Sequence, residues 1–288
     1  MKSIILTLMA TLLMVGCGRE IIPDEELSNK DRMNKLQISD PLVWNSLVDQ
    51  SIKIDTSGLG LKGANGTMKI FEYPGDGKYY YTIFEDLYPS QGDYDFNDLM
   101  LESRLFLEPR KNEISGRLNA TMFHRGGTLK TQISLAFYSN NGKKGYEIIP
   151  NEQIRINDVD LTGQEPYAMD VPKAGANFDI NFILSKGEVP IDNIWVSWFI
   201  QVESGGEVRE IHTAGFPLYK VNKFEIPQRD YLTQNNLPWG LEIMAERFYV
   251  PLEKTLFLDA FPEFKVWAES GGDENTEWFK NPDLKYIN

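Results

Sequence analysis

Residues 92–108 read GDYDFNDLMLESRLFLE, and the two halves of this stretch point to a fold and to a site. The second half places leucine at every second position for most of its length, alternating with Met100, Glu102, Arg104 and Glu108. The leucines are Leu99, Leu101, Leu105 and Leu107. A period of two is typical of a β-strand that buries one face. The first half crowds oxygen-bearing side chains, so something must offset their repulsion.

Four more segments between residues 114 and 202 alternate in the same way. They are 114–122, 133–137, 178–184 and 194–202. Turn signals separate them, namely Asn140-Asn141-Gly142, Lys173-Ala174-Gly175 and Ser204-Gly205-Gly206. Strands without intervening helical patterns favour antiparallel sheets over βαβ units. The sequence therefore predicts an all-β fold, a jelly-roll-like antiparallel β-sandwich. A short C-terminal helix is expected over 257–268, ending at Gly271-Gly272.

The acidic half of the opening stretch is a candidate calcium loop. In a regular strand its carboxylates would lie about 6.7 Å apart on one face, too far to share one ion. A bend at Gly92, with Pro89 upstream, folds them inward. Calcium takes six to eight oxygen ligands, and such a loop provides most of them. The expected ligands are Asp93, Asp95, Asn97 and Asp98, completed by Glu85 and Asp86.

The loop is not an EF-hand, although its D-x-D-x-N start resembles one. Asp98 stands where an EF-hand needs glycine, and Arg104 stands where it needs glutamate. A solvated turn, in which Asp93 or Asn97 caps backbone amides, is the alternative. Repulsion among four close acidic or amide groups favours the cation.

The first sixteen residues have the pattern of a signal peptide, with Lys2 before an apolar run and Gly16 at the end. The run is too short to span a bilayer, which takes about 20 residues. Leu13-Met14-Val15-Gly16-Cys17 resembles the lipobox of bacterial lipoproteins. The resemblance implies that Cys17 is lipidated and anchors the mature chain in the membrane. An ordinary secreted protein with a stray cysteine is the alternative.

Composition divides the rest of the chain. Residues 17–60 are mostly polar and are predicted to be the lipidated cysteine and a tether, with a short helix near 41–48. Residues 61–288 are predicted to form the β-sandwich domain. Cys17 is the only cysteine, so disulfides are excluded. The full chain has a formal charge of −13, and removing Lys2 lowers it to −14. Nucleic acid is therefore excluded as a partner.

Most enzyme classes lack their residues in this chain. His124 and His212 are the only histidines, which excludes three-histidine zinc sites and H-E-x-x-H. No G-x-S-x-G occurs, and the G-x-G-x-x-G at 58–63 is not followed by a helix pattern. His212 beside Glu210 is interpreted as a structural histidine, and the tryptophans are assigned to packing.

A carbohydrate-active hydrolase is the alternative function. Such an enzyme needs two carboxylates on opposite sides of a sugar, and Asp93 to Asp98 with Glu102 would supply them. A tight cluster of four favours a metal over a separated pair, so no catalytic residue is predicted. The balance favours a protein that is not an enzyme.

Residues 84–99 resemble the signature of the LruC-type domain, a family of envelope lipoproteins found in Bacteroides relatives, among others. Residues 235–241, 249–253 and 267–272 resemble its closing motifs. Residues 210–217 are similar to its His-x-x-Gly-Tyr-Pro segment, with Phe216 in place of the tyrosine. The matches extend from about residue 61 to residue 282. The resemblance implies an envelope or surface protein with no established enzymatic chemistry.

Together these observations predict a lipid-anchored lipoprotein of the bacterial outer membrane, with surface exposure left open. Its calcium-stabilised sandwich would act as a binding or envelope-organising module. The partner would be a protein or glycan of the envelope or of a host.

Overall fold

The computed structural model describes residues 28–38, 79–140, 146–164, 167–171, 173–191, 194–213 and 232–288. Several predictions lie outside these residues. They are the signal peptide, Cys17, the helix near 41–48, the glycine-rich segment 58–63 and the Gly-Phe-Pro end of the 210–217 motif.

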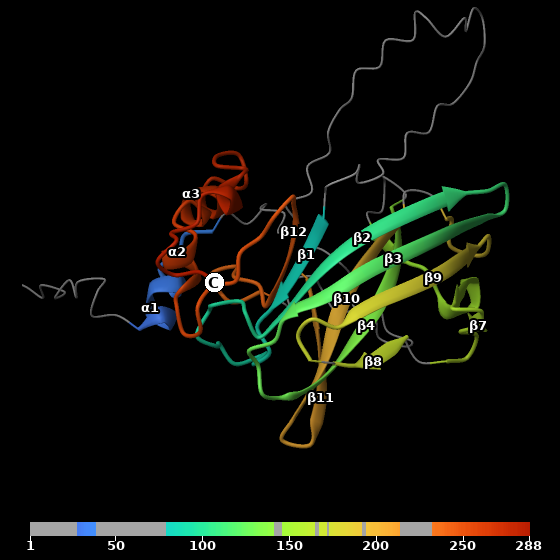
Figure 1. Cartoon of the computed structure of the whole chain (residues 1–288), viewed down its shortest axis with the longest axis horizontal. Helices are drawn as coiled ribbons and strands as arrows, with labels where there is room; N and C mark the ends of the chain where they lie inside the picture. Colours follow the sequence, from blue (N-terminus) through green and yellow to red (C-terminus); the bar gives the residue numbers. More distant parts are fainter. Residues whose placement is uncertain are drawn as a thin grey trace, which may run out of the picture.

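Two antiparallel sheets face each other (Figure 1). The first has the order β12 (Gly240–Ala245), β1 (Tyr79–Phe84), β2 (Leu99–Pro109), β3 (Glu113–His124), β9 (Asn177–Ser185), β6 (Ile154–Ile156) and β7 (Val159–Asp160). The second has the order β11 (Glu207–His212), β10 (Ile194–Ser204), β4 (Lys130–Asn140) and β5 (Tyr146–Ile148), and β8 (Ala168–Asp170) also pairs with β4. The predicted β-sandwich is confirmed, and each of the five expected strands is present.

The main core lies between the sheets. It consists of the inward residues of the alternating strands, including Leu101, Leu118, Leu135 and Phe182. Trp198 is 1% exposed in this core, and its Nε1 donates a hydrogen bond of 2.7 Å to Ser103 Oγ. Burial of the alternate leucines is the physical reason that the period-two pattern predicts these strands.

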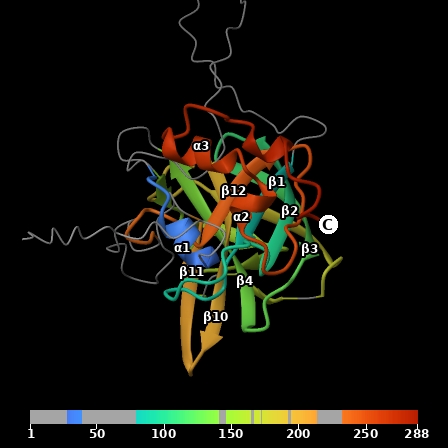
Figure 2. The ribbon, with the colours of Figure 1, turned by 90° about the vertical axis from the view of Figure 1, so that its left-hand side faces the viewer.

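A second core covers the other face of β1 and β12. Helices α1 (Asn29–Asn34), α2 (Phe257–Ala260) and α3 (Phe264–Glu269) gather there, as Figures 1 and 2 show. The short turn η4 (Trp278–Lys280) contributes buried rings to the same core. Its sheet residues include Tyr81, Ile83, Leu241 and Ile243. Because β1 and β12 are buried on both faces, their sequences show no simple alternation. Trp267 and Trp278 are buried here, as predicted for packing residues.

Helix α1 lies inside the region predicted to be a tether. Met33, Leu36 and Ile38 are buried in the second core. Arg32 makes two hydrogen bonds to the carboxylate of Asp259, at 2.6 and 2.8 Å. Three apolar residues within six positions are too few to reveal a helical or strand period. The mostly polar composition of the region therefore led to the prediction of a solvated tether.

The C-terminal helix predicted over 257–268 is two short helices. Pro262 explains the break, because proline disfavours helical backbone at the residue before it. Phe261 indeed has a non-helical backbone, with φ −129° and ψ 78°. The predicted stop is confirmed, since Gly271 and Gly272 both have positive φ, and the Gly272 N–H donates to Trp267 O. The 3-10 turn η2 (Asn151–Gln153) precedes β6.

Candidate metal centre

In the loop before β2, the backbone conformation directs the acidic side chains and the aromatic side chains to different places. Tyr94 and Phe96 have left-handed φ values of 59° and 54°. This region is unfavourable for L-residues by about 1 kcal/mol each. Burial offsets that energy, since both rings are fully buried in the second core and Phe96 packs on Phe257 with ring centroids 5.1 Å apart. The residues between them are thereby gathered instead of being spread along a strand.

Three carboxylates meet in this loop. Glu85, Asp93 and Asp95 each offer an oxygen, and the three oxygens lie within 4.8 Å of one another. Glu85 is 0% exposed and Asp95 is 1% exposed. Glu85 Oε1 accepts a hydrogen bond of 2.7 Å from the Phe96 N–H. Glu85 Oε2 is buried and accepts no hydrogen bond from the described residues.

Asp95 and Asn97 connect the loop to residues 251–254. Asp95 Oδ1 accepts from the Asn97 N–H at 3.2 Å, and Oδ2 accepts from the Lys254 N–H at 2.8 Å. The Asn97 side-chain amide donates to Pro251 O at 3.2 Å. Asn97 Oδ1 is buried and, among the described residues, has no donor. Asn97 is therefore held in place with an acceptor unused.

Glu253 is a residue near the cluster that the sequence did not predict. A Cβ placed on Gly126 would lie 2.7 Å from Asn97 Oδ1 and 3.2 Å from Glu253 Oε2, so both oxygens border one small space. Glu253 also acts electrostatically on Asp95, raising its pKa. More than 150 residues separate Glu253 from the loop, and the only sequence signal was its place in the motif at 249–253.

Asp86 and Asp98 form a neighbouring pair outside the converging triad. Asp98 Oδ2 accepts from the Asp86 N–H at 2.8 Å, which closes the two ends of the loop on each other. Asp86 is 6% exposed. Glu102 lies farther along β2, where it accepts a hydrogen bond from the Tyr81 hydroxyl at 3.0 Å. The structure thus brings Glu85, Asp93 and Asp95 together and places the other predicted acids around them.

Glycines provide the space that these oxygens occupy. A Cβ on Gly92 would lie 2.2 Å from Glu85 Oε2, and a Cβ on Gly127 would lie 2.4 Å from Asp86 Oδ2. The Gly126 N–H donates to the backbone oxygens of Asn97 and Asp98, both at 3.1 Å. Side chains at these positions would fill the space beside the buried oxygens.

Burial makes the charged forms of these acids unfavourable. It raises the pKa of Glu85 well above its usual value, and the charges of Asp98 and Asp95 add to the effect. Burial and the charge of Asp93 raise the pKa of Asp95 to about 7. Burial and the charge of Asp86 raise the pKa of Asp98 to about 7. A cation placed among these oxygens would reverse each of these shifts.

The donor set fits calcium. Carboxylates, an amide carbonyl and backbone oxygens are the ligands that a hard divalent cation takes, and calcium accepts an irregular arrangement of them. Glu85 Oε2 and Asn97 Oδ1 are buried acceptors without a donor among the described residues, a state that is unfavourable by about 1–3 kcal/mol for each group. A cation among the three carboxylates would satisfy Glu85, and Asn97 Oδ1 borders the space beside Glu253.

His212 is a buried histidine on β11. Its Nε2 lies 3.2 Å from Glu210 Oε2, and its ring stacks on Phe199 with centroids 4.4 Å apart. Burial lowers the pKa of His212. These contacts match the structural role that the sequence indicated.

Comparisons with known proteins give a family model and a similar structure. Residues 149–279 match a family described as a domain of unknown function, DUF4842. No curated protein matches the chain. A crystal structure of a "putative lipoprotein" from Bacteroides ovatus is similar, with 15% sequence identity and a TM-score of 0.42 over 73% of this chain and 76% of that chain. In the described part of the chain, every helix is too short or too polar to cross a membrane.

Proposed function

We propose that the protein is a calcium-stabilised binding module and that Glu85, Asp93 and Asp95 hold the ion. Asn97 and Glu253 would complete the ligand shell, while Asp86 and Asp98 support the loop from the side. The observation that carries this proposal is Glu85 Oε2, which is fully buried beside two other carboxylates and accepts no hydrogen bond from the described residues. The cation would supply the missing positive charge and lock the loop between β1 and β2.

The buried position of the cluster favours a stabilising ion over catalysis. A glycosidase needs carboxylates that reach both sides of a sugar ring. Glu85 and Asp95 are almost fully enclosed, and the Asp95 oxygens are engaged by backbone N–H groups. A polysaccharide chain has no access to such groups, so the proposal does not include hydrolysis.

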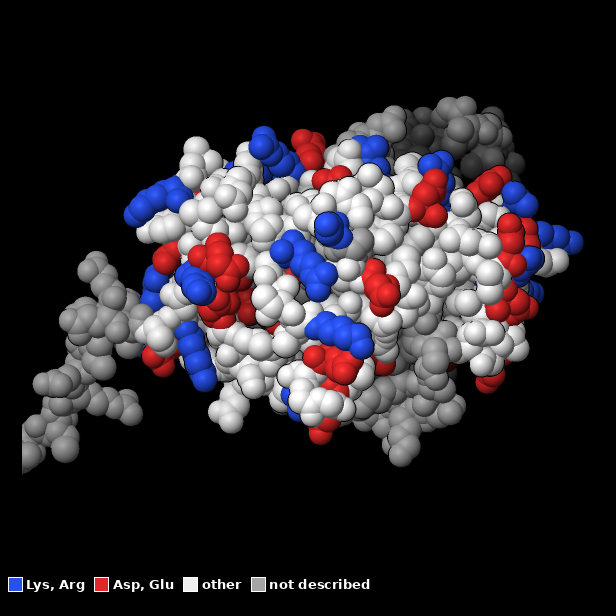
Figure 3. Space-filling model, turned by 60° about the horizontal axis from the view of Figure 1, so that its bottom comes forward, with Lys and Arg blue, Asp and Glu red and all other residues white. Residues whose placement is uncertain are grey.

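The proposal also includes an anchor and a domain. Lipid on Cys17 would fix the chain to the outer membrane, and residues 61–288 would form an LruC-type domain beyond the tether. The lipobox-like residues 13–17 and the motifs around residues 84–99 and 235–272 support these two statements. The partner would be an envelope or host molecule. Positive and negative side chains are interspersed on the face shown in Figure 3, which argues against a strongly charged polymer as the partner.

Thermal melting with calcium and with EDTA tests the metal. A ligand at about 100 times its Kd stabilises by about 2.7 kcal/mol. For a domain of this size that corresponds to a rise in Tm of roughly 5–10 °C. Asp93→Asn keeps the shape of a proposed ligand while removing its charge, and should abolish most of the rise.

Asp273→Asn is the matched control, because it makes the same change at an exposed position after α3. It should keep the full calcium response. Equal melting temperatures in calcium and EDTA for the unmodified protein would contradict the metal proposal. A response that Asp93→Asn leaves intact would place the ion elsewhere.

A further inference from the structure

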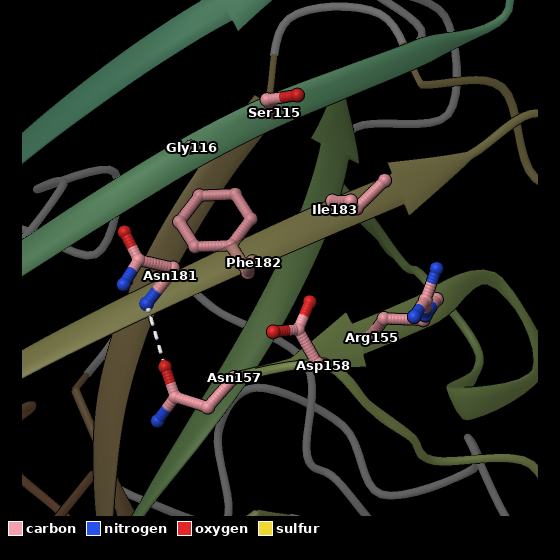
Figure 4. A pocket seen from close by; sticks show the side chains of 8 residues that line it. All are labelled: Ser115, Gly116, Arg155, Asn157, Asp158, Asn181, Phe182 and Ile183. Atoms are coloured by element: carbon pink, nitrogen blue, oxygen red, sulfur yellow. Dashed lines mark hydrogen bonds between the residues drawn. The ribbon is translucent and has the colours of Figure 1, made fainter.

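A shallow groove crosses the outer face of the seven-stranded sheet, away from both cores. It consists of two adjoining depressions of about 440 and 360 Å³, which share Ser115, Gly116 and Asn181. Figure 4 shows the larger depression, with Asn181, Asn157, Asp158 and Arg155 around it. The small side chain of Ser115 leaves this hollow open, whereas the space beside Gly116 is filled by the buried ring of Phe182, which would lie 2.1 Å from a Cβ at that position.

Strand register lays the groove residues in two rows across the sheet. Phe106 is paired with Arg117, which is paired with Asn181. The second row runs from Glu108 through Ser115 and Ile183 to Arg155. The first row crosses three strands and the second crosses four, so three spacings of about 4.8 Å give the second row a length of roughly 14 Å. An extended ligand fits this shape better than a compact one.

Side chains in the two rows have donors and acceptors that are not used in hydrogen bonds within the described part of the protein. Two of the Arg117 nitrogens donate to Asp179, at 2.9 and 3.2 Å, and a guanidinium has five N–H donors. Asn157 Oδ1 accepts from the Asn181 N–H at 3.0 Å, which fixes Asn157 and leaves its amide donors. Among the described residues, the Asn181 side-chain amide makes no hydrogen bond. These groups offer donors and acceptors side by side.

The groove also has an apolar end. Phe106 is 40% exposed, a large fraction for an aromatic side chain on a polar face. It lies at the β2 end of the first row and lines the smaller depression. A flat ring beside amide and guanidinium groups matches a ligand that is apolar on one face and polar at its edges.

The charges of the groove nearly cancel. Arg117 and Arg155 oppose Glu108, Asp158 and Asp179, and Arg117 is already paired with Asp179. A site for phosphate or a polyanion would need an excess of positive charge. Vicinal hydroxyl groups, in contrast, both donate and accept hydrogen bonds and carry no charge.

We infer that this groove binds a neutral oligosaccharide, with Asn181 and Arg117 contacting hydroxyl groups and Phe106 stacking on a sugar ring. The inference rests on the proposed role as a binding module and names its ligand class. The groove is also independent of the metal centre, because Phe106 lies eight residues beyond Asp98 along an extended strand, about 26 Å away.

Calorimetry against neutral hexasaccharides tests the inference. The panel contains α- and β-linked glucans, mannan, galactan and xylan fragments, together with one sulfated and one uronic-acid oligosaccharide. At least one neutral member should bind with a Kd below about 1 mM, a value typical of a shallow site. Asn181→Ala and Phe106→Ala should each weaken that binding by about tenfold.

Asn177→Ala is the matched control, since Asn177 lies on the same face of β9, four residues before Asn181. It should leave binding unchanged, and all three variants should melt within a few degrees of the unmodified protein. The inference is overturned if no neutral member binds at about 5 mM. It is also overturned if Asn177→Ala and Asn181→Ala weaken binding equally, or if only the anionic members bind and salt abolishes that binding.

Failure here is distinguishable from failure of the metal proposal. Titrations are made with calcium and repeated with Asp93→Asn, which leaves every groove residue in place. Loss of glycan binding in the groove variants, with the calcium response of Tm kept, assigns the effect to the groove. A missing calcium response with glycan binding intact would overturn the metal proposal alone.

Discussion

Replacing Glu242 by glutamine should make the protein more stable at alkaline pH. Glu242 lies on β12, is 2% exposed and faces the main core. Its Oε2 accepts hydrogen bonds from Trp195 Nε1 at 3.3 Å and Ser197 Oγ at 3.4 Å. The described residues place no cation beside it. Thr82 lies directly opposite on β1, and its buried Oγ1 has no partner among the described residues.

The size of the effect follows from burial. Burial raises the pKa of Glu242 to about 8 from an ordinary 4.5. The folded chain therefore holds a proton that the unfolded chain releases between these values. Stability from this proton is complete below pH 4.5 and is lost as the pH rises through 8. The full loss is about 5 kcal/mol, or about 1.4 kcal/mol for each pH unit.

Glutamine removes this dependence because its neutral amide resembles the protonated acid in shape. Its oxygen accepts the bonds from Trp195 and Ser197, and its nitrogen offers Thr82 Oγ1 a donor across the strand pair. Glu242→Gln should match the unmodified protein within about 1 kcal/mol near pH 5. It should exceed the unmodified protein by several kcal/mol above pH 8.

Urea unfolding between pH 5 and pH 9 measures this difference. Saturating calcium is kept throughout, so that the acids of the metal centre contribute equally to both proteins. Glu246→Gln, which changes an exposed glutamate just after β12, is the control for the substitution. A difference between Glu242→Gln and the unmodified protein that stays constant with pH would refute the reasoning, because Glu242 would then be charged in the folded chain.

Three further changes test the loop and the anchor. Phe96→Ala removes a fully buried ring packed on Phe257 and should destabilise by about 3–5 kcal/mol in urea unfolding. Gly92→Ala places a methyl group 2.2 Å from Glu85 Oε2 and should weaken calcium binding at least about tenfold by calorimetry, whereas a wild-type Kd would refute the proposed ligand. Cys17→Ala should move the protein from the membrane fraction to the soluble fraction, and retention in the membrane would exclude the lipid anchor.

The sequence predicted the strands in which every second residue is apolar and enters the main core. β2, β3 and β9 have a more polar opposite side. β4 and β10 are buried on the opposite side too, but serine alternates with the apolar residues there, at Ser134 and Ser197, so the period of two remains visible. β1 reads YYYTIF and β12 reads GLEIMA, and neither alternates because the second core buries their other face. Helices α2 and α3, more than 150 residues from β1, cover that second face together with α1. Local pattern carries no information about such long-range contacts.

The sequence predicted which residue types form the candidate site, but not which structural role each acidic residue has. Asp93, Asp95 and Asn97 were expected to turn inward, and left-handed backbone at the two intervening aromatic residues brings this about. Nothing in the spacing separates Asp98, which caps the Asp86 N–H, from Asp95, which lies among the converging carboxylates. Glu253 was missed because it reaches the loop only through the fold.

The alternation of oxygens and rings in GDYDFNDL has a structural reason. Tyr94 and Phe96 enter the second core, while Asp95 and Asn97 bind the backbone of residues 251–254. Tyr94 O also accepts from the Phe257 N–H at 2.9 Å, at the start of α2. The loop is thus the joint between the sandwich and the C-terminal helices. Repulsion among its buried acids acts directly on that joint, so one cation would stabilise the packing of both cores at once.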